Sequence, residues 1–241
     1  METLAEVNRL REVYRQYAAC GFAESKWSNL NKGNQAIQTE REGKTRELLR
    51  RSGFFPLSSK RILDVGCGTG KQLGTFLEWG AQPEKLFGID LIPDRVAAAR
   101  TMFPGITFQL ANAESLPYPG GAFDLVAVFT VFTSILNRAM AVNIAHEINR
   151  VLAPKGAVLW YDFRMNNPFN PHVTGLSRKR IAGLFPGFGM ALEAISLLPP
   201  LARHLGALTD RLYITLSALP FLRTHLLGLL TKPGILQDGS K

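Results

Sequence analysis

The feature that most constrains this chain is the segment ILDVGCGTG at residues 62–70. A short apolar run ends in Asp64, and Gly66, Gly68 and Gly70 follow at alternate positions. Glycine is needed in such a turn because a side chain would keep the backbone away from a ligand at the carboxyl end of the strand. The segment therefore predicts the first strand and the ligand-binding turn of an α/β domain.

Strand-like and helix-like segments alternate after this turn. Residues 123–130, FDLVAVFT, form a continuous apolar run, which is typical of a strand buried on both faces of a parallel sheet. Together the segments predict an α/β fold with a doubly wound, mostly parallel sheet. The predicted strands are residues 61–65, 85–89, 106–110, 123–130 and 157–161, and the predicted helices are residues 71–79, 93–102 and 137–152.

The flanking segments are predicted to complete a seven-stranded sheet. Helices are expected over residues 4–17, 35–51 and 177–185, strands over 190–198 and 225–232, and a helical insertion over 199–219 between these last two strands. We therefore expect one structural domain in three parts. Residues 1–60 form an N-terminal helical lid, residues 61–163 the cofactor-binding core, and residues 164–241 the part that completes the sheet and carries the insertion on the substrate side.

Asp90 ends the second predicted strand, twenty residues after Gly70. A carboxylate there can accept hydrogen bonds from both hydroxyls of a ribose, each worth roughly 1.5–3 kcal/mol. The sequence therefore predicts a nucleoside-containing ligand. The dinucleotide motif G-x-G-x-x-G/A has a third small residue where this chain has Lys71, which weakens a nicotinamide-dependent dehydrogenase as an alternative but leaves it open.

Four motifs, in order, resemble those of a known family: ILDVGCGTG at residues 62–70, GID at 88–90, NAESLPYPGGAFDLV at 112–126 and EINRVLAPKGAVLWYDF at 147–163. On these motifs the chain resembles the class I S-adenosylmethionine-dependent methyltransferases, and among them the bacterial small-molecule methyltransferases. The resemblance implies a Rossmann-like methyltransferase fold, S-adenosyl-L-methionine as the methyl donor and S-adenosyl-L-homocysteine as the product.

The resemblance also implies which residues would hold the cofactor. The methionine and ribose side of the site would be formed by Asp64, Gly66, Cys67, Gly68 and Gly70, and the ribose hydroxyls would bind to Asp90. The adenine would contact Leu91, Asn112 and Ala113. The sulfonium would lie above Phe129 and Thr130. The family usually has Asp-Ala where this chain has Asn112-Ala113, which keeps an acceptor and drops a charge. Cys67 has no base near it in the sequence, so we interpret it as a small loop residue.

Catalysis of methyl transfer requires mainly in-line positioning, with proton removal when the acceptor is a hydroxyl. Asp162 and His172 are the candidate general bases, because both follow the fifth strand. Asp162 could instead hold the loop backbone, and His172 could be a surface residue. Arg164, Asn166 and Asn167 are candidates for binding a polar or anionic acceptor, although adjacent asparagines are also common turn formers.

The acceptor is expected to be a small molecule, with a hydroxyl of a metabolite, glycan or lipid-linked intermediate as the methylated group. Trp27 in the N-terminal lid is a candidate substrate contact, although packing beneath the lid would explain this tryptophan equally well. No spacing of cysteines and histidines resembles a zinc site, so no metal is expected.

The net charge of +9 is unevenly distributed: residues 1–60 carry +4, residues 61–163 carry −1 and residues 164–241 carry +6. Basic flanks can favour phosphates, nucleic acid or an anionic membrane surface. Nucleic-acid methylation is the main alternative function. Family members that methylate base amino groups carry an Asn/Asp-Pro-Pro-aromatic motif after the fourth strand, where this chain has FTVFTSI, so we disfavour a nucleic-acid partner.

A membrane surface is a further possible partner. No apolar run reaches the roughly 18 residues that a spanning helix needs, and the first residues lack the apolar core of a signal peptide. We therefore expect a cytoplasmic protein, with peripheral membrane contact as an option. In the insertion, Leu201, Leu205, Leu208 and Leu212 recur at helical spacing, which fits packing on the sheet, a substrate lid or a membrane interface.

Overall fold

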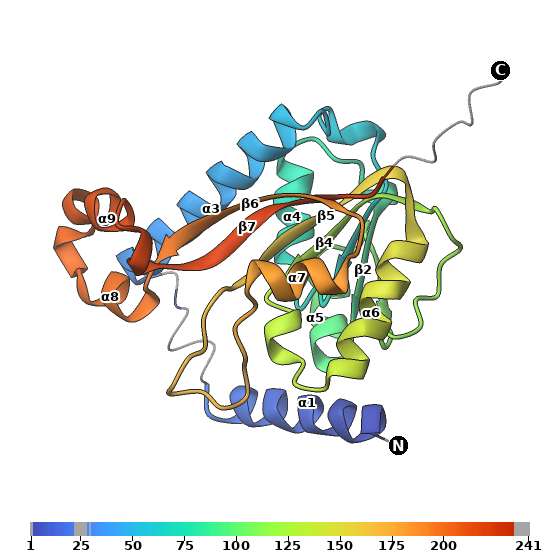
Figure 1. The fold of residues 1–241 in the computed structure, drawn as a ribbon, viewed down its shortest axis with the longest axis horizontal. Helices are drawn as coiled ribbons and strands as arrows, with labels where there is room; N and C mark the ends of the chain where they lie inside the picture. The colour runs from blue at the N-terminus through green and yellow to red at the C-terminus, as the bar shows by residue number, and fades with distance from the viewer. Residues whose placement is uncertain (1, 22–27, 29, 234–241) are drawn as a thin grey trace.

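The computed structural model describes residues 2–21, 28 and 30–233. Its centre is a seven-stranded sheet with the strand order β3-β2-β1-β4-β5-β7-β6 (Figure 1). Strands β1 to β5 pair in parallel, and β7 is antiparallel to both β5 and β6. This confirms the predicted mostly parallel sheet. The strands are β1 (Ile62–Val65), β2 (Leu86–Asp90), β3 (Thr107–Leu110), β4 (Phe123–Phe129), β5 (Leu152–Phe163), β6 (Gly189–Leu197) and β7 (Arg223–Thr231).

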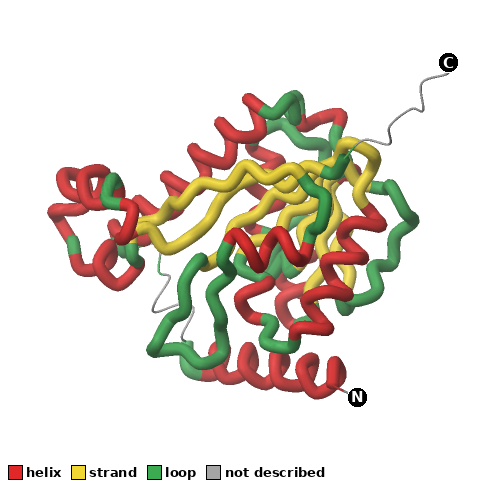
Figure 2. The backbone as a smooth tube through the Cα atoms, viewed as in Figure 1, coloured by secondary structure: helices red, strands yellow, loops and turns green. Residues whose placement is uncertain are grey.

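Helices cover both faces of the sheet (Figures 1 and 2). The side chains of β1 alternate between two apolar cores: Leu63 and Val65 pack on one face with α6 and α7, and Ile62 packs on the other with α3, α4 and α5. The helices are α1 (Glu2–Ala19), α3 (Lys32–Arg51), α4 (Lys71–Glu78), α5 (Pro93–Met102), α6 (Arg138–Val151), α7 (Arg178–Leu184), α8 (Pro199–His204) and α9 (Thr209–Ser217). None in the described part of the chain is long and apolar enough to cross a bilayer.

The carboxyl ends of β1, β2 and β4 meet at one edge of the sheet. Val65 is in register with Ile89 on one side and Val128 on the other, so Asp90 and Phe129 follow at the same level. Parallel pairing therefore brings the glycine turn after β1 beside residues that lie far away in the sequence. This is the place where open α/β sheets bind their ligands.

Helix α3 corrects one part of the predicted lid. It packs along the sheet and against the insertion, where the Asn31 side chain donates a hydrogen bond to the Arg203 carbonyl at 3.2 Å. A Cβ at Gly33 would lie 2.1 Å from the Ala202 carbonyl oxygen, so only glycine permits this close helix contact. Helix α3 was expected over the cofactor, but among the described helices α1 alone lies across the carboxyl edge, because α3 packs on the sheet and on α8.

The insertion between β6 and β7 is helical, as predicted, and consists of α8, a 3-10 turn η4 (Gly206–Leu208), α9 and a second 3-10 turn η5 (Pro220–Leu222). It projects from the body of the molecule beside the amino-terminal end of α3 (Figure 1). Leu201 and Leu205 pack into a small apolar core with Ile37 and Tyr213. Leu208 and Leu212 remain 52% and 38% exposed, so the predicted leucine periodicity is only half used for packing on the protein.

Candidate functional site

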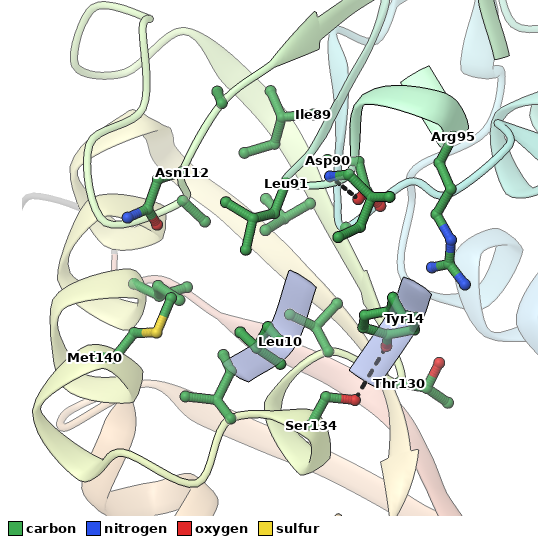
Figure 3. A pocket seen from close by; sticks show the side chains of 18 of the residues that line it. Leu10, Tyr14, Ile89, Asp90, Leu91, Arg95, Asn112, Thr130, Ser134 and Met140 are labelled. Atoms are coloured by element: carbon green, nitrogen blue, oxygen red, sulfur yellow. Dashed lines mark hydrogen bonds between the residues drawn. The ribbon is translucent and has the colours of Figure 1, made fainter. Parts of the chain in front are cut away.

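Two adjoining cavities open at the carboxyl edge of the sheet. The first lies between α1, the ends of β1, β2 and β4, the turn after β3, and α6 (Figure 3). The second follows the glycine turn toward the carboxyl end of α1. Because Tyr14, Gly66, Arg95, Phe129 and Thr130 line both, the two cavities form one continuous site.

The glycine turn is shaped for close approach of a ligand. Gly66 and Gly68 have φ of +70° and +55°, which favour glycine. No atom lies within 4 Å of the position that a Cβ at Gly68 would take, so the space above this residue is open. Gly70 differs from the prediction: it lines neither cavity, and a Cβ there would lie 2.8 Å from the Phe108 ring. Gly70 therefore serves packing and the turn itself.

Asp64 lies beneath this turn and is 2% exposed. Its Oδ1 is buried and has no hydrogen-bond partner among the described residues, although the side chain lines the second cavity. Burial raises the pKa of this carboxyl well above its usual value, and the nearby charge of Asp90 raises it further, while Arg41 acts in the opposite direction. An unpaired buried acceptor of this kind is costly, and a cationic donor would satisfy it.

Asp90 has both carboxylate oxygens anchored by backbone amides. Oδ2 accepts from the Gly68 amide at 2.8 Å, and Oδ1 accepts from the Ile92 amide at 2.9 Å. Each carboxylate oxygen has further acceptor capacity, which is the requirement for binding a pair of ligand hydroxyls. Asp90 lines the first cavity and is 6% exposed. The carboxylate therefore fixes the glycine turn and faces the site at the same time.

The far wall of the first cavity combines apolar contacts and an amide. Leu91, Asn112 and Ala113 line it, and Leu91 faces Leu10 of α1 across the space (Figure 3). The Asn112 Oδ1 accepts from the Glu114 amide at 3.1 Å, and its Nδ2 donates to the Glu114 carboxylate at 3.1 Å. This pairing fixes the orientation of the side chain at the cavity edge. A flat, largely apolar ring with a polar edge would fit between these walls.

Thr130 has a strained backbone where the two cavities meet. Its φ is +55°, in a region that non-glycine residues rarely adopt. The conformation is held by a hydrogen bond from its amide to the Tyr161 carbonyl at 2.7 Å and by one from its hydroxyl to the Phe129 carbonyl at 2.7 Å. Strain of this kind persists where the surrounding structure imposes it, and such residues concentrate at functional sites.

Helix α1 lies within the predicted N-terminal lid and supplies a wall of the site through residues that were not among the predicted site residues. Tyr14 and Leu10 line the first cavity, and the Tyr14 hydroxyl lies 3.2 Å from Ser134 Oγ (Figure 3). The guanidinium of Arg95 lies 4.2 Å from the centre of the Tyr14 ring, a cation–π contact that links α1 to α5. Only the helical periodicity of Tyr14 signalled that this residue faces inward.

Glu6 anchors the other end of α1. Its carboxylate accepts from the Leu136 amide at 2.7 Å, the Asn137 amide at 3.3 Å and the Arg9 guanidinium at 2.7 Å. Burial raises the pKa of Glu6, but hydrogen bonds from Arg9 and the two amides outweigh it, so the net pKa is below its usual value. Glu6 and Tyr14 are thus two of the points at which the helix is fastened.

Asp162, a predicted catalytic base, is 1% exposed and lines neither cavity. Its Oδ1 accepts from the Thr133 hydroxyl at 2.5 Å and the Phe163 amide at 2.9 Å, and its Oδ2 accepts from the Thr133 amide at 3.1 Å. Burial raises its pKa to about 6, against the lowering effect of these hydrogen bonds. The geometry corresponds to the alternative interpretation, in which Asp162 holds the turn that follows Thr130.

The remaining predicted substrate residues lie on the loop between β5 and α7. Asn166 accepts hydrogen bonds from Thr174 and the Gly175 amide, Asn167 accepts from the Phe169 amide, and the Arg164 guanidinium donates to the Pro220 carbonyl. None of the three lines either cavity, so their side chains build the loop and do not face the site as predicted. Trp27 lies outside the described residues.

His172 is half-buried on the same loop and also lines neither cavity. The loop reaches α1, because the Tyr17 hydroxyl and the Asn170 side chain lie within hydrogen-bond distance of each other. Tyr17 lines the second cavity, so His172 is two residues from a contact with the cavity wall.

The geometry of the described residues also bears on two other kinds of chemistry, a nucleophilic cysteine and a metal site. Burial raises the pKa of the Cys67 thiol far above its usual value, which opposes a nucleophilic role. Within residues 2–21, 28 and 30–233, no three or more His, Cys, Asp or Glu side chains gather in a way that could hold a metal ion.

Residues 62–156 match a family described as methyltransferase domains. The demethylmenaquinone methyltransferase of Thermus thermophilus is 35% identical over 108 residues, which cover 43% of this chain and 47% of that protein. The phthiotriol/phenolphthiotriol dimycocerosates methyltransferase of Mycobacterium leprae is 31% identical over 130 residues, which cover 53% of this chain and 47% of that protein. The chain thus spans about half the length of the relatives it matches.

The fold has a similar counterpart among solved structures. An S-adenosylmethionine-dependent methyltransferase from Mesorhizobium loti superimposes with a TM-score of 0.58 and 18% sequence identity, over 79% of this chain and 99% of that one. At this identity the likeness concerns the fold alone.

Proposed function

We propose that this chain, whose residues 62–156 match a family of methyltransferase domains, transfers a methyl group from S-adenosylmethionine to a hydroxyl of a small, lipid-like molecule. When bound, the cofactor supplies a methyl group already activated by a sulfonium. The protein then has to bind the cofactor, orient the acceptor in line with the methyl group and exclude water.

The observation that carries this proposal is the buried, unpaired Oδ1 of Asp64 at the cavity. The amino group of the methionine moiety is a cationic donor that would satisfy this oxygen. Asp90 would take the ribose hydroxyls, and Leu91, Asn112 and Ala113 would enclose the adenine. These assignments fit the residues present, because the amino group, the ribose hydroxyls and the adenine each find a partner of matching chemistry.

The end of β4 is the proposed position of methyl transfer. Phe129 and Thr130 line both cavities, so they lie between the nucleoside side and the side that opens toward α1. The rigid, strained backbone at Thr130 would keep the acceptor and the methyl group at a fixed separation. Asp162 acts here as a positioning residue, since it holds Thr133 in the turn that follows.

A lipid-like acceptor is supported by the names of the relatives. One is a demethylmenaquinone methyltransferase, and another is a phthiotriol/phenolphthiotriol dimycocerosates methyltransferase. A further relative is named a ubiquinone/menaquinone biosynthesis C-methyltransferase, so transfer to a ring carbon is the second candidate reaction. For the hydroxyl reaction we propose His172 as the general base, because its loop touches the cavity wall at Tyr17.

The experiment is incubation of the protein with methyl-labelled S-adenosylmethionine and three separate acceptor pools: a lipid and quinone extract, polar metabolites, and RNA. We expect label in the lipid fraction, and mass spectrometry with NMR of the product would distinguish an O-methyl from a C-methyl group. The Asp90→Ala variant should lose this activity, whereas Asp210→Ala, whose side chain is 78% exposed on the insertion, should keep it. Label in RNA alone would overturn the proposal in favour of nucleic-acid methylation.

A further inference from the structure

Large apolar side chains are exposed together on the insertion between β6 and β7. We call the following set the insertion face: Leu208 at 52% exposure, Leu212 at 38%, Ile214 at 77%, Leu219 at 40% and Phe221 at 70%. The opposite side of α9 is used for packing, where Thr209, Tyr213 and Ser217 are buried. The exposed residues therefore belong to the unburied part of a docked helix and to the turns on either side of it.

The exposed apolar side chains are close together in the chain. Leu212 and Ile214 belong to α9, Leu208 ends the turn η4 before it, and Leu219 follows the end of the helix. Leu30, which is 93% exposed, belongs to the same end of the molecule, because the adjacent Asn31 is hydrogen-bonded to the Arg203 carbonyl of α8. Large apolar side chains that are exposed together in this way are unusual on a protein that makes no contact through them.

The charges around the insertion face are mainly positive. Residues 198–222 contain Arg203 and Arg211 but a single acid, Asp210, which forms an exposed ion pair with Lys32 at 3.4 Å. The whole segment of residues 164–241 carries +6. Apolar side chains beside arginines are the pattern of segments that lie in the interface of an anionic bilayer.

We propose that the insertion face docks onto the surface of an anionic lipid bilayer, with its apolar side chains among the lipid headgroups and the exposed Arg211 near the phosphates. A second copy of the chain is a poorer occupant, because it would bring the same positive surroundings against themselves. This proposal goes beyond the proposed function, since docking requires neither the cofactor nor methyl transfer.

Docking would also bring the bilayer near the cofactor-side cavity. Ser28 lines the second cavity, and its carbonyl accepts a hydrogen bond from the Asn34 side chain of α3 at 3.0 Å. Residues 28 and 30–34 thus lead from the cavity wall to the contact with α8. A lipid-like acceptor could then pass from the bilayer to the cavity along residues 28 and 30–34. This last step rests on the proposed function.

Cosedimentation with lipid vesicles tests the docking. The purified protein is mixed with phosphatidylcholine vesicles that contain or lack phosphatidylglycerol, at low and high salt. The test variant is Ile214→Ser with Phe221→Ser, and the control is Met190→Ser at the start of β6, where the side chain is 38% exposed. Circular dichroism and thermal unfolding verify that both variants are folded, and Arg211→Glu tests the charge separately.

We expect the wild type and Met190→Ser to sediment with the anionic vesicles and to be released by high salt. The double variant should bind at least about fivefold more weakly, and Arg211→Glu should also bind more weakly. Absence of vesicle binding, or binding that the double variant retains, would overturn the proposal. A monomeric double variant beside a dimeric wild type in sedimentation velocity, without vesicle binding, would assign the face to a second copy. Cofactor titration of the same samples separates these results from a failure of the proposed function.

Discussion

Oδ2 of Asp90 accepts a hydrogen bond from the amide of Gly68 at 2.8 Å, which ties the end of the second strand to the glycine turn that follows the first. One carboxylate therefore shapes the turn and remains available to a ligand. A change at Asp90 should disturb both functions, and the cofactor site should be more sensitive to it than to any exposed acid.

Asp90→Ala is expected to weaken S-adenosylhomocysteine binding by more than tenfold, or ~1.4 kcal/mol. The variant loses the ribose acceptor and leaves the amides of Gly68 and Ile92 without their partner. Isothermal titration calorimetry measures the change, with Asp210→Ala as the control. An unchanged affinity would remove Asp90 from the cofactor site.

Asp64 should make cofactor binding dependent on pH. Its pKa is raised by burial and by Asp90, whereas the ligand amino group binds the ionised form of the carboxyl. Affinity for S-adenosylhomocysteine should therefore rise as the pH is raised from acidic to neutral. Asp64→Asn should bind more weakly, without this rise. Parallel pH profiles for the two proteins would show that Asp64 does not meet the amino group.

The attachment of α1 should control access to the cavity. Glu6→Ala leaves the amides of Leu136 and Asn137 without their acceptor, at a cost of about 1–3 kcal/mol. Hydrogen exchange of the α1 amides should then become faster, and S-adenosylhomocysteine should bind more weakly, while the amides of β4 stay protected. The control is Glu12→Ala, which removes an exposed pair with Arg15 on the same helix. If Glu6→Ala leaves α1 exchange unchanged, the helix is held by other contacts.

Asp162 should affect stability in a defined pH window. Its pKa is about 6 in the folded protein and near 3.8 when unfolded, so the native state binds the proton more tightly. Proton binding by Asp162 therefore adds up to about 3 kcal/mol to the free energy of unfolding. This contribution is complete below the pKa of the unfolded state and is lost as the pH rises through about 6. Urea unfolding of wild type and Asp162→Asn at pH 4 and pH 7 should therefore show a stability difference that shrinks at the higher pH. A constant difference would contradict the raised pKa.

His172→Ala tests the proposed base. It should lower turnover far more than it lowers affinity for S-adenosylhomocysteine, because His172 lines neither cavity of the cofactor site. The loss should be largest near neutral pH and partly overcome at alkaline pH, where the acceptor hydroxyl ionises more readily. Turnover equal to wild type would mean that transfer depends on positioning alone or that another group removes the proton.

Much of the sheet could be predicted because its signals are local. The apolar run before Asp64, the glycines after it and the position of Asp90 each depend on a few neighbouring residues. Residues predicted to hold the cofactor line the cavities with the exception of Gly70, whose requirement for glycine comes from the Phe108 ring on another strand. Such a contact leaves no mark in the local pattern.

The other walls of the site could not be predicted, because they are formed by contacts between residues that are far apart in the sequence. Tyr14 and Arg95 meet only because α1 lies over the carboxyl edge, and helical periodicity does not say which surface a helix covers. The same ambiguity placed α3 over the cofactor, although it packs on the sheet. Asp162 shows the limit for polar residues, since its partner Thr133 precedes it by 29 positions and its burial follows from the folded sheet.

Binding of the methyl-transfer cofactor in this cavity can be measured directly by calorimetric titration of the purified protein with S-adenosylhomocysteine, with NADH as the control. We expect S-adenosylhomocysteine to bind in the micromolar range and NADH to give no heat. Binding of NADH alone, or of neither ligand, would show that the cavity is not a site for S-adenosylmethionine.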